Sequence, residues 1–296
     1  KLATSISQEF PSHNFSWKIL AAVLGQTGRK SEALHANKTL VVLLPQDAEA
    51  HINLGNTFKE VGRLEEAEAS YRQAIALKLD FSEAYYNLGV TLKKLGRLEE
   101  AELSYTQAIA LKPDFAEAHG NLGNTLQEVG KLEEAEASYR QAIALKSGFY
   151  EAYYNLGVTL KKMSRLKEAE TSYKQAIALK SDFALAHSNL GVTLQELGRL
   201  DEAEASLRQA IALKPDYAEA HSNLGVTLQE LGRLDEAEVS YTQAIALKPE
   251  YAEAYSNLGG VLQELGRLDD AEAGYTQAIV LNPYYAEAYA NLGGTL

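Results

Sequence analysis

Apolar positions in this chain recur at helical spacing, and the whole pattern repeats every 34 residues. In the unit 116–149, Ala118, Leu122 and Leu126 lie four residues apart, which gathers them on one side of a helix. Gly130 interrupts the pattern, and a second amphipathic stretch follows it. The spacing therefore predicts two helices joined by a tight turn in each unit.

The tripeptide Asn-Leu-Gly occurs once in each unit after the first and shows how far the array extends. Its asparagines are Asn53, Asn87, Asn121, Asn155, Asn189, Asn223, Asn257 and Asn291. A fixed period of this size indicates stacked helix pairs that bury their apolar sides against their neighbours. We therefore predict an all-α fold, an α-solenoid of about eight and a half 34-residue helix-turn-helix repeats.

The repeats leave no room for a second domain, so we expect one continuous solenoid over residues 14–296 after an N-terminal lead-in at 1–13. Its repeats are predicted at 14–47, 48–81, 82–115, 116–149, 150–183, 184–217, 218–251 and 252–285, with a half-repeat at 286–296.

Two local features of the repeat make specific predictions. Gly123 lies inside a first helix, where glycine costs roughly 1 kcal/mol relative to alanine. Because glycine returns at this place in other repeats, we expect the paired helices to approach closely, with Tyr139 packing over the gap.

At the preceding junction, Asp114 is expected to cap the next helix, with Glu117 three residues on as in a capping box.

These features together resemble the tetratricopeptide repeat (TPR) family over residues 14–296: the 34-residue length, the Leu-Gly pair, the turn glycine, the Ala and Tyr of the second helix and the closing proline. The resemblance implies a right-handed superhelix with a concave groove for protein partners. The segment 16–29 is similar to bacterial repeat arms that continue into O-linked N-acetylglucosamine transferase-like or sulfotransferase domains. Single turns depart from the family pattern, such as Ser164 in place of the turn glycine.

The asparagines of the tripeptide are the first candidate binding residues. They resemble the asparagine ladder by which the repeat arm of O-linked N-acetylglucosamine transferase holds the backbone of extended peptides. A carboxamide both donates and accepts, so it can pair with a peptide bond of any sequence. The alternative is that these side chains bond between neighbouring helices. The candidates are Asn53, Asn87, Asn121, Asn155, Asn189, Asn223 and Asn257.

Two repeats add aromatic and basic residues to the same side of the first helix. At the places of the lysines, other repeats carry Gln and Glu. The aromatic and basic side chains are predicted to bind a carboxylate or an acidic peptide through charge-assisted hydrogen bonds. The alternative is solvated surface charge. The residues concerned are Tyr86, Lys93, Lys94, Tyr154, Lys161 and Lys162.

The composition of the chain limits the classes of partner and the environments that we expect for the protein. The formal charge of -12 would repel phosphate backbones, so we expect no nucleic acid. Apolar runs such as 19–24 and 40–44 are too short to cross a bilayer, so we expect no membrane insertion. Zero cysteines exclude disulfides and thiolate metal sites without identifying a compartment. We expect a soluble protein, in the cytoplasm by preference, or outside the cell if it forms filaments.

No catalytic set, phosphate loop or metal-ligand cluster stands out from the repeat pattern, so we predict neither enzymatic activity nor a cofactor. Four histidines recur at one place in the repeat and do not converge on a metal, so we assign them to aromatic packing: His51, His119, His187 and His221. The sequons at Asn14 and Asn37 matter only if the protein enters a glycosylating secretory route.

Two functions remain open on this basis. The first is a non-catalytic interaction scaffold that binds proteins or extended peptides in its groove, as part of a longer protein. The second is a structural subunit that assembles head to tail into a filament. It is motivated by the half-repeat 286–296, which lacks a second helix to cover Leu292 and Gly293.

Overall fold

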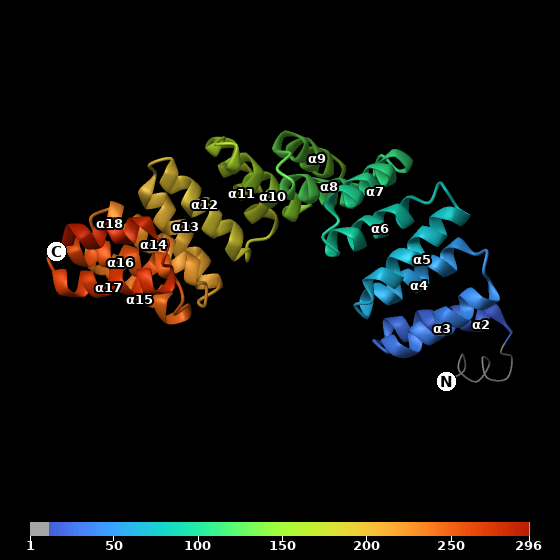
Figure 1. Ribbon diagram of the computed structural model, residues 1–296. Coiled ribbons are helices and arrows are strands. Elements are labelled where there is room, and N and C mark those ends of the chain that lie inside the picture. Colours follow the sequence, from blue (N-terminus) through green and yellow to red (C-terminus); the bar gives the residue numbers. More distant parts are fainter. Residues whose placement is uncertain (1–11, 296) are drawn as a thin grey trace. The chain divides into compact units, whose positions relative to one another are not determined.

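The computed structural model describes residues 12–295, and in this range it contains 17 α-helices and no strand (Figure 1). The first helices of the repeats are α2 (Asn14–Gln26), α4 (Ala48–Glu60), α6 (Ser82–Lys94), α8 (Ala116–Glu128), α10 (Tyr150–Lys162), α12 (Ala184–Glu196), α14 (Ala218–Glu230), α16 (Ala252–Glu264) and α18 (Ala286–Thr295). The second helices are α3 (Lys30–Leu43), α5 (Leu64–Leu77), α7 (Leu98–Leu111), α9 (Leu132–Leu145), α11 (Leu166–Leu179), α13 (Leu200–Leu213), α15 (Leu234–Leu247) and α17 (Leu268–Leu281). The predicted all-α solenoid of helix pairs is confirmed. Most of the predicted lead-in at 1–13 lies outside the described residues.

The chain divides into two compact units, Lys1–Ser147 and Gly148–Leu296. Within each unit, the closest packing joins the two helices of one repeat, and the next closest joins a second helix to the first helix of the following repeat. Each helix therefore packs mainly against the helices that precede and follow it in sequence, as expected of a solenoid. The single uninterrupted array stays a prediction.

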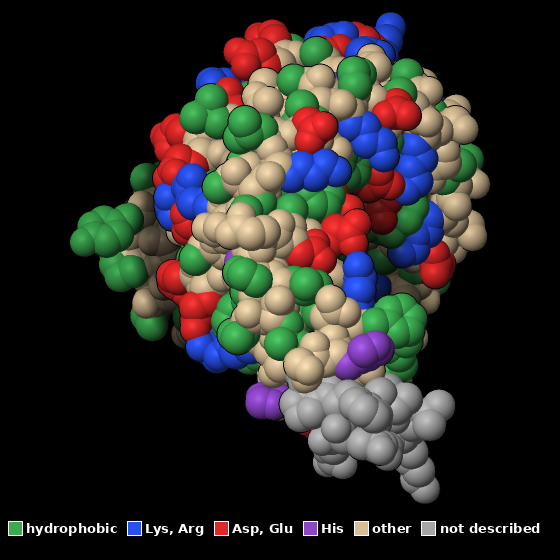
Figure 2. Space-filling view, turned by 90° about the vertical axis from the view of Figure 1, so that its right-hand side faces the viewer, with side chains coloured by type: hydrophobic (Ala, Val, Ile, Leu, Met, Phe, Trp, Pro, Cys, Tyr) green, Lys and Arg blue, Asp and Glu red, His purple; other side chains and the backbone are tan. Residues whose placement is uncertain are grey.

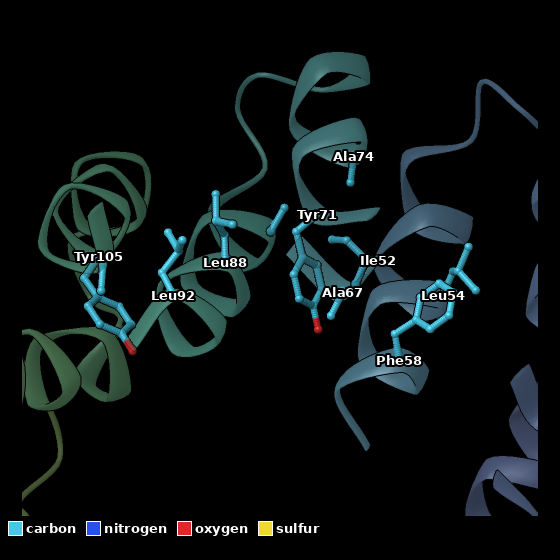
Figure 3. Close-up of a cluster of buried hydrophobic side chains, with 11 residues drawn as sticks. Ile52, Leu54, Phe58, Ala67, Tyr71, Ala74, Leu88, Leu92 and Tyr105 are labelled. Carbon is cyan, nitrogen blue, oxygen red and sulfur yellow. The ribbon is translucent and has the colours of Figure 1, made fainter. Parts of the chain in front are cut away.

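Alanine, leucine and tyrosine fill the space between the paired helices. Figure 3 shows part of the first unit, where Tyr71 from α5 and Tyr105 from α7 lie among leucine and isoleucine side chains of the first helices. The fully buried tyrosines of the second helices are Tyr71, Tyr105, Tyr139, Tyr173, Tyr241 and Tyr275. At the same place in the repeat 184–217, Leu207 is buried instead.

The helix-interior glycine is explained by these tyrosines. A Cβ atom at Gly123 would lie 2.7 Å from the ring of Tyr139, which is closer than real Cβ contacts. At Gly191 the near neighbour is the side chain of Leu207, at 2.6 Å. The predicted close approach of the two helices is therefore confirmed, and it accounts for a residue that a helix interior otherwise disfavours.

The turn between the two helices needs a left-handed residue. Gly130 has φ +83°, whereas Ser164 adopts φ +60° where the other internal turns have glycine. A left-handed conformation costs a residue with a Cβ atom about 1 kcal/mol. The hairpin of the repeat 150–183 therefore carries backbone strain that its neighbours avoid.

The predicted cap at Asp114 is wrong. The N-cap residue of α8 is Phe115, and no side chain caps this helix. Asp114 stands one residue too early, in a turn where the backbone N–H groups of Phe115 and Ala116 bond Lys112 O and Asp114 O. Asp47, at the N-cap position of α4, does accept from the N–H groups of Glu49 and Ala50.

Ion pairs join successive second helices on their exposed side. In the first unit, Arg97 contacts Glu68 of the preceding repeat at 2.6 Å and Glu100 of its own helix at 2.7 Å. In the second unit, Arg233 pairs in the same way with Glu204 and Glu236. Figure 2 shows basic and acidic side chains interspersed on the face that it draws. Exposed pairs of this kind contribute little stability each.

Candidate peptide-binding face

The candidate residues lie on one side of the first helices. We call the first-helix face the positions occupied in α8 by Asn121, Asn124, Gln127 and Glu128, together with their equivalents in α4, α6, α10, α12, α14 and α16. The structure brings the predicted asparagines and lysines to this face within each unit, but their environments differ from repeat to repeat.

Three of the predicted asparagines bond to a neighbouring repeat. Asn87 is 7% exposed, and its Oδ1 accepts from Nζ of Lys59 at 3.0 Å. Asn121 donates through Nδ2 to the hydroxyl of Tyr86 at 3.0 Å. The same bond joins Asn189 to Tyr154 at 2.9 Å. These carboxamides therefore help to hold successive first helices together.

Three others are free at the carboxamide. Across residues 12–295, the side chains of Asn53, Asn223 and Asn257 have no hydrogen-bond partner. Asn53 is exposed, and the other two are half-buried. Asn155 and Asn291, by contrast, are engaged with other groups of the protein. The ladder is thus uneven, and only part of it presents both a donor and an acceptor to a partner.

The residue before the ladder asparagine contacts the aromatic residue 29 positions later, and we call this contact between repeats the seam. Tyr86 and Tyr154 are the first members of two such seams. The ring of Tyr86 lies 4.7 Å from that of Phe115, and the ring of Tyr154 lies 4.9 Å from that of Phe183. Burial raises the pKa of both phenols, so they stay protonated at neutral pH.

Later repeats close the same seam with different residues. Ser188 stands at the place of Tyr154 and is hydrogen-bonded to Tyr217. Ser222 is bonded to Tyr251 in the same way, and Ser256 to Tyr285. In these five repeats the seam therefore takes two forms, a tyrosine with a phenylalanine or a serine with a tyrosine.

Two of the four predicted lysines are already paired. Nζ of Lys93 lies 2.8 Å from Glu128, and Nζ of Lys161 lies 3.0 Å from Glu196. Lys94 and Lys162 are exposed and form no ion pair with any residue that the structure describes. Of the four predicted lysines, Lys94 and Lys162 therefore carry the charge that is available to an acidic partner.

Lys59 is a residue of this face that the sequence reasoning missed. It occupies in α4 the place of Lys93 in α6, so its register in the repeat could have identified it. It is half-buried, its Nζ lies 5.9 Å from the centroid of the Tyr71 ring, and burial followed by repulsion from Lys94 lowers its pKa. The charged form of Lys59 is therefore disfavoured by its surroundings.

Hollows open on the face in both units. One of about 390 Å³ in the second unit is lined by Val158, Lys161, Lys162, Tyr173, Asn189 and Glu196. Another of about 230 Å³ in the first unit includes Asn53, Asn56 and Glu60 in its lining. Each has room for peptide side chains beside a ladder asparagine.

The remaining candidates have structural explanations. The ring Nε2 of His51 lies 3.0 Å from the carbonyl oxygen of Pro45, and His221 repeats this contact with Pro215. A hydrogen bond to the chain six residues earlier thus adds to the predicted packing role. No group of potential metal ligands occurs in the described part of the chain. Among the described helices, none is long and apolar enough to span a bilayer.

The two sequons differ in access. Asn14 is exposed at the first residue of α2. Asn37 is 5% exposed, and its Nδ2 donates to the hydroxyl of Thr57 at 2.8 Å. Only Asn14 therefore presents its amide to solvent in the folded protein.

Comparisons with known proteins agree with this architecture. Family profiles described as tetratricopeptide repeat match residues 114–182, 149–216, 182–250 and 216–281, and a further one matches residues 82–115. A profile described as TPR repeat matches residues 55–96. No curated protein sequence matches the chain.

Several solved structures are similar. YrrB, described as a TPR protein with an unusual peptide-binding site, is 27% identical with a TM-score of 0.54, over 65% of this chain and 98% of its own. MamA is 25% identical with a TM-score of 0.53, over 56% of this chain and 97% of its own. The Cut9–Hcn1 assembly of the APC/C is 17% identical with a TM-score of 0.64, over 99% of this chain and 58% of its own, and supports the fold alone.

Proposed function

Because the chain belongs to the tetratricopeptide repeat family, we propose that it is a non-catalytic scaffold that binds extended segments of protein or peptide on its first-helix face. The observation that carries the proposal is the set of unpaired carboxamides, Asn53, Asn223 and Asn257. Each offers a donor and an acceptor at the same place in its repeat. A peptide backbone presents the complementary groups at every residue, whatever its sequence.

The cost of leaving these groups unpaired also favours a ligand. Asn223 and Asn257 are half-buried, so their contact with water is reduced in the free protein. A polar group with too few hydrogen bonds gains when a partner supplies them. YrrB is described as having a peptide-binding site, which supports the same class of ligand for this chain.

The distribution of charge favours neutral or locally acidic segments. Most of the formal charge of -12 is spread over the second helices and the helix ends, where many carboxylates are paired. Lys94 and Lys162 add two unpaired cations to the first-helix face. Binding should therefore weaken as salt increases, because exposed charges are screened.

The proposal can be tested with peptides selected on the purified protein from a displayed library of unstructured decapeptides. Binding of a selected peptide would be compared between the wild type and the triple variant Asn53→Ala, Asn223→Ala, Asn257→Ala. We expect affinity to fall about tenfold or more with little change in melting temperature. Failure to select any peptide, or unchanged affinity in the triple variant, would contradict the proposal.

The pair Asn121→Ala and Asn189→Ala provides the matched control. These carboxamides bond Tyr86 and Tyr154 of the preceding repeat, so their removal should lower the melting temperature. The head-to-tail filament stays a prediction.

A further inference from the structure

A regular bond crosses from each first helix to the next on the first-helix face. We call it a rung: it joins the residue at the place of Gln127 in one repeat to the residue at the place of Glu128 in the following repeat, 35 positions later. Four rungs within the two units connect a donor to a carboxylate. They are Lys93–Glu128 at 2.8 Å, Lys161–Glu196 at 3.0 Å, Gln195–Glu230 at 2.7 Å and Gln229–Glu264 at 2.5 Å.

The rung between α4 and α6 has two donors and no carboxylate. Its members are Lys59 and Lys94, because lysine stands where α8, α12, α14 and α16 carry glutamate. Lys59 turns its Nζ to Oδ1 of Asn87 at 3.0 Å, and Lys94 is exposed without an ion pair in residues 12–295. The two ammonium groups therefore repel each other at a position where the four rungs above are held by attraction.

Nearby acidic residues do not supply the missing carboxylate of this rung. Glu60 and Glu83 are the carboxylates that act on Lys59 through space, and neither forms an ion pair with Lys59 or Lys94 in the described structure. Asn87 supplies only a neutral oxygen to Lys59. A half-buried ammonium with no anionic partner is unfavourable, and a bound carboxylate would relieve it.

We propose that Lys59 and Lys94 bind a carboxylate supplied by the partner, which takes the position that the Glu128 side chain has in the following rung. This inference rests on the proposed function of the first-helix face, and it adds an acidic anchor to a surface that otherwise recognises the peptide backbone. The carboxylate comes from an Asp or Glu side chain or from the C-terminus of the bound segment. Both sources make the same charge-assisted hydrogen bonds to the two ammonium groups.

The decisive variant is Lys94→Glu. It gives this rung the donor–carboxylate pair of its neighbours, so it should fold at least as well as the wild type while closing the site. Lys167→Glu is the matched control, because it makes the same charge change at a place where the repeats on either side carry Glu133 and Asp201. Lys167 lies in α11, away from the first-helix face.

We expect peptides selected on the wild type to be enriched in an acidic residue at one position. Replacing that residue by its amide, or amidating the C-terminus where it supplies the group, identifies the source. Affinity should fall about tenfold in Lys94→Glu with an unchanged or higher melting temperature, and should stay within about twofold in Lys167→Glu. A loss of affinity in Lys94→Glu that is matched by Lys167→Glu would overturn the site, because general electrostatics would then explain it.

Selected peptides that show no acidic enrichment, or whose enrichment persists on Lys94→Glu, would overturn this inference and leave the proposed function standing. If no peptide is selected, the proposed function fails, and the site is then tested with acetate alone. Side-chain NMR signals of Lys59 should shift with acetate in the wild type and not in Lys94→Glu. Equal shifts in both proteins would overturn the site.

Discussion

The repeats 82–115 and 218–251 build the same helix pair with different chemistry on the first-helix face. The first closes its seam with Tyr86 and Phe115, and its rung with Lys93 and Glu128. The second closes its seam with Ser222 and Tyr251, and its rung with Gln229 and Glu264. The buried contact of a glycine with a tyrosine ring is the same in both, at Gly89 and Gly225. The array therefore keeps its packing constant while the exposed face varies, which is what a binding scaffold needs.

The largest expected effect on stability concerns the contact between glycine and tyrosine that the two repeats share. Gly89→Ala and Gly225→Ala should each cost about 2 kcal/mol, because a Cβ atom would lie 2.8 and 2.7 Å from a fully buried tyrosine ring. Gly260→Ala is the control, since the nearest atom to its Cβ would be 3.8 Å away. That variant should gain up to about 1 kcal/mol from helix propensity. Thermal and urea unfolding measure all three, and unequal losses at the two buried sites would break the claim of common packing.

The strained turn gives the next largest effect. Ser164→Gly should stabilise the protein by about 1 kcal/mol, because Ser164 has φ +60°. Gly198→Ser, at the equivalent turn with φ +72°, should destabilise it by a similar amount. Urea unfolding of the two variants provides the measurement. Equal and opposite shifts are expected, and a loss of stability in Ser164→Gly would show that the serine side chain contributes more than its strain costs.

The two seams can be compared directly by giving the repeat 218–251 the seam residues of the repeat 82–115. Tyr251→Phe should cost about 1 kcal/mol, because the hydroxyl loses its bond to Ser222. Ser222→Tyr alone should cost at least as much, since two tyrosine hydroxyls would meet in one seam. The double variant recreates the pair seen at Tyr86 and Phe115, and it offers Asn257 the bond that Asn121 makes.

The double variant should therefore be more stable than the sum of the single losses by about 1 kcal/mol. A double-mutant cycle in urea measures this coupling. Additive losses would mean that the two seam solutions are not interchangeable, and that the resemblance between the repeats stops at the buried core.

The smallest effect concerns the buried phenols. The hydroxyl of Tyr139 donates to Oδ1 of Asn124 at 2.8 Å, so Tyr139→Phe should cost about 1 kcal/mol. The buried hydroxyl of Tyr173 has no partner among the described residues, because Val158 and Lys161 replace the amide side chains. Tyr173→Phe should therefore be neutral or stabilise by up to about 1 kcal/mol. Equal losses in the two variants would reveal a partner for Tyr173.

Much of this architecture could be predicted because the period is long and regular. Repetition made the helix pairs, the turn glycines and the close contact at Gly123 evident from the residues alone. The cap at Asp114 was mispredicted because residue preference could not locate the helix start to one residue. The unequal environments of Asn87 and Asn223 were also beyond the sequence, since they depend on which side chain the adjacent repeat presents.

The central claim is that partners bind on the first-helix face, and site-specific photo-crosslinking tests it most directly. A benzoylphenylalanine would replace Glu253 or Thr242. Glu253 is exposed in the first turn of α16, four residues before Asn257 and therefore on the same side of the helix as the first-helix face, whereas Thr242 is exposed on α15. Each protein would be irradiated with a labelled peptide selected on the wild type, and the crosslinked yield would be measured by gel fluorescence. The account predicts labelling from position 253 and background yield from position 242. Labelling from position 242 with none from position 253 would contradict it.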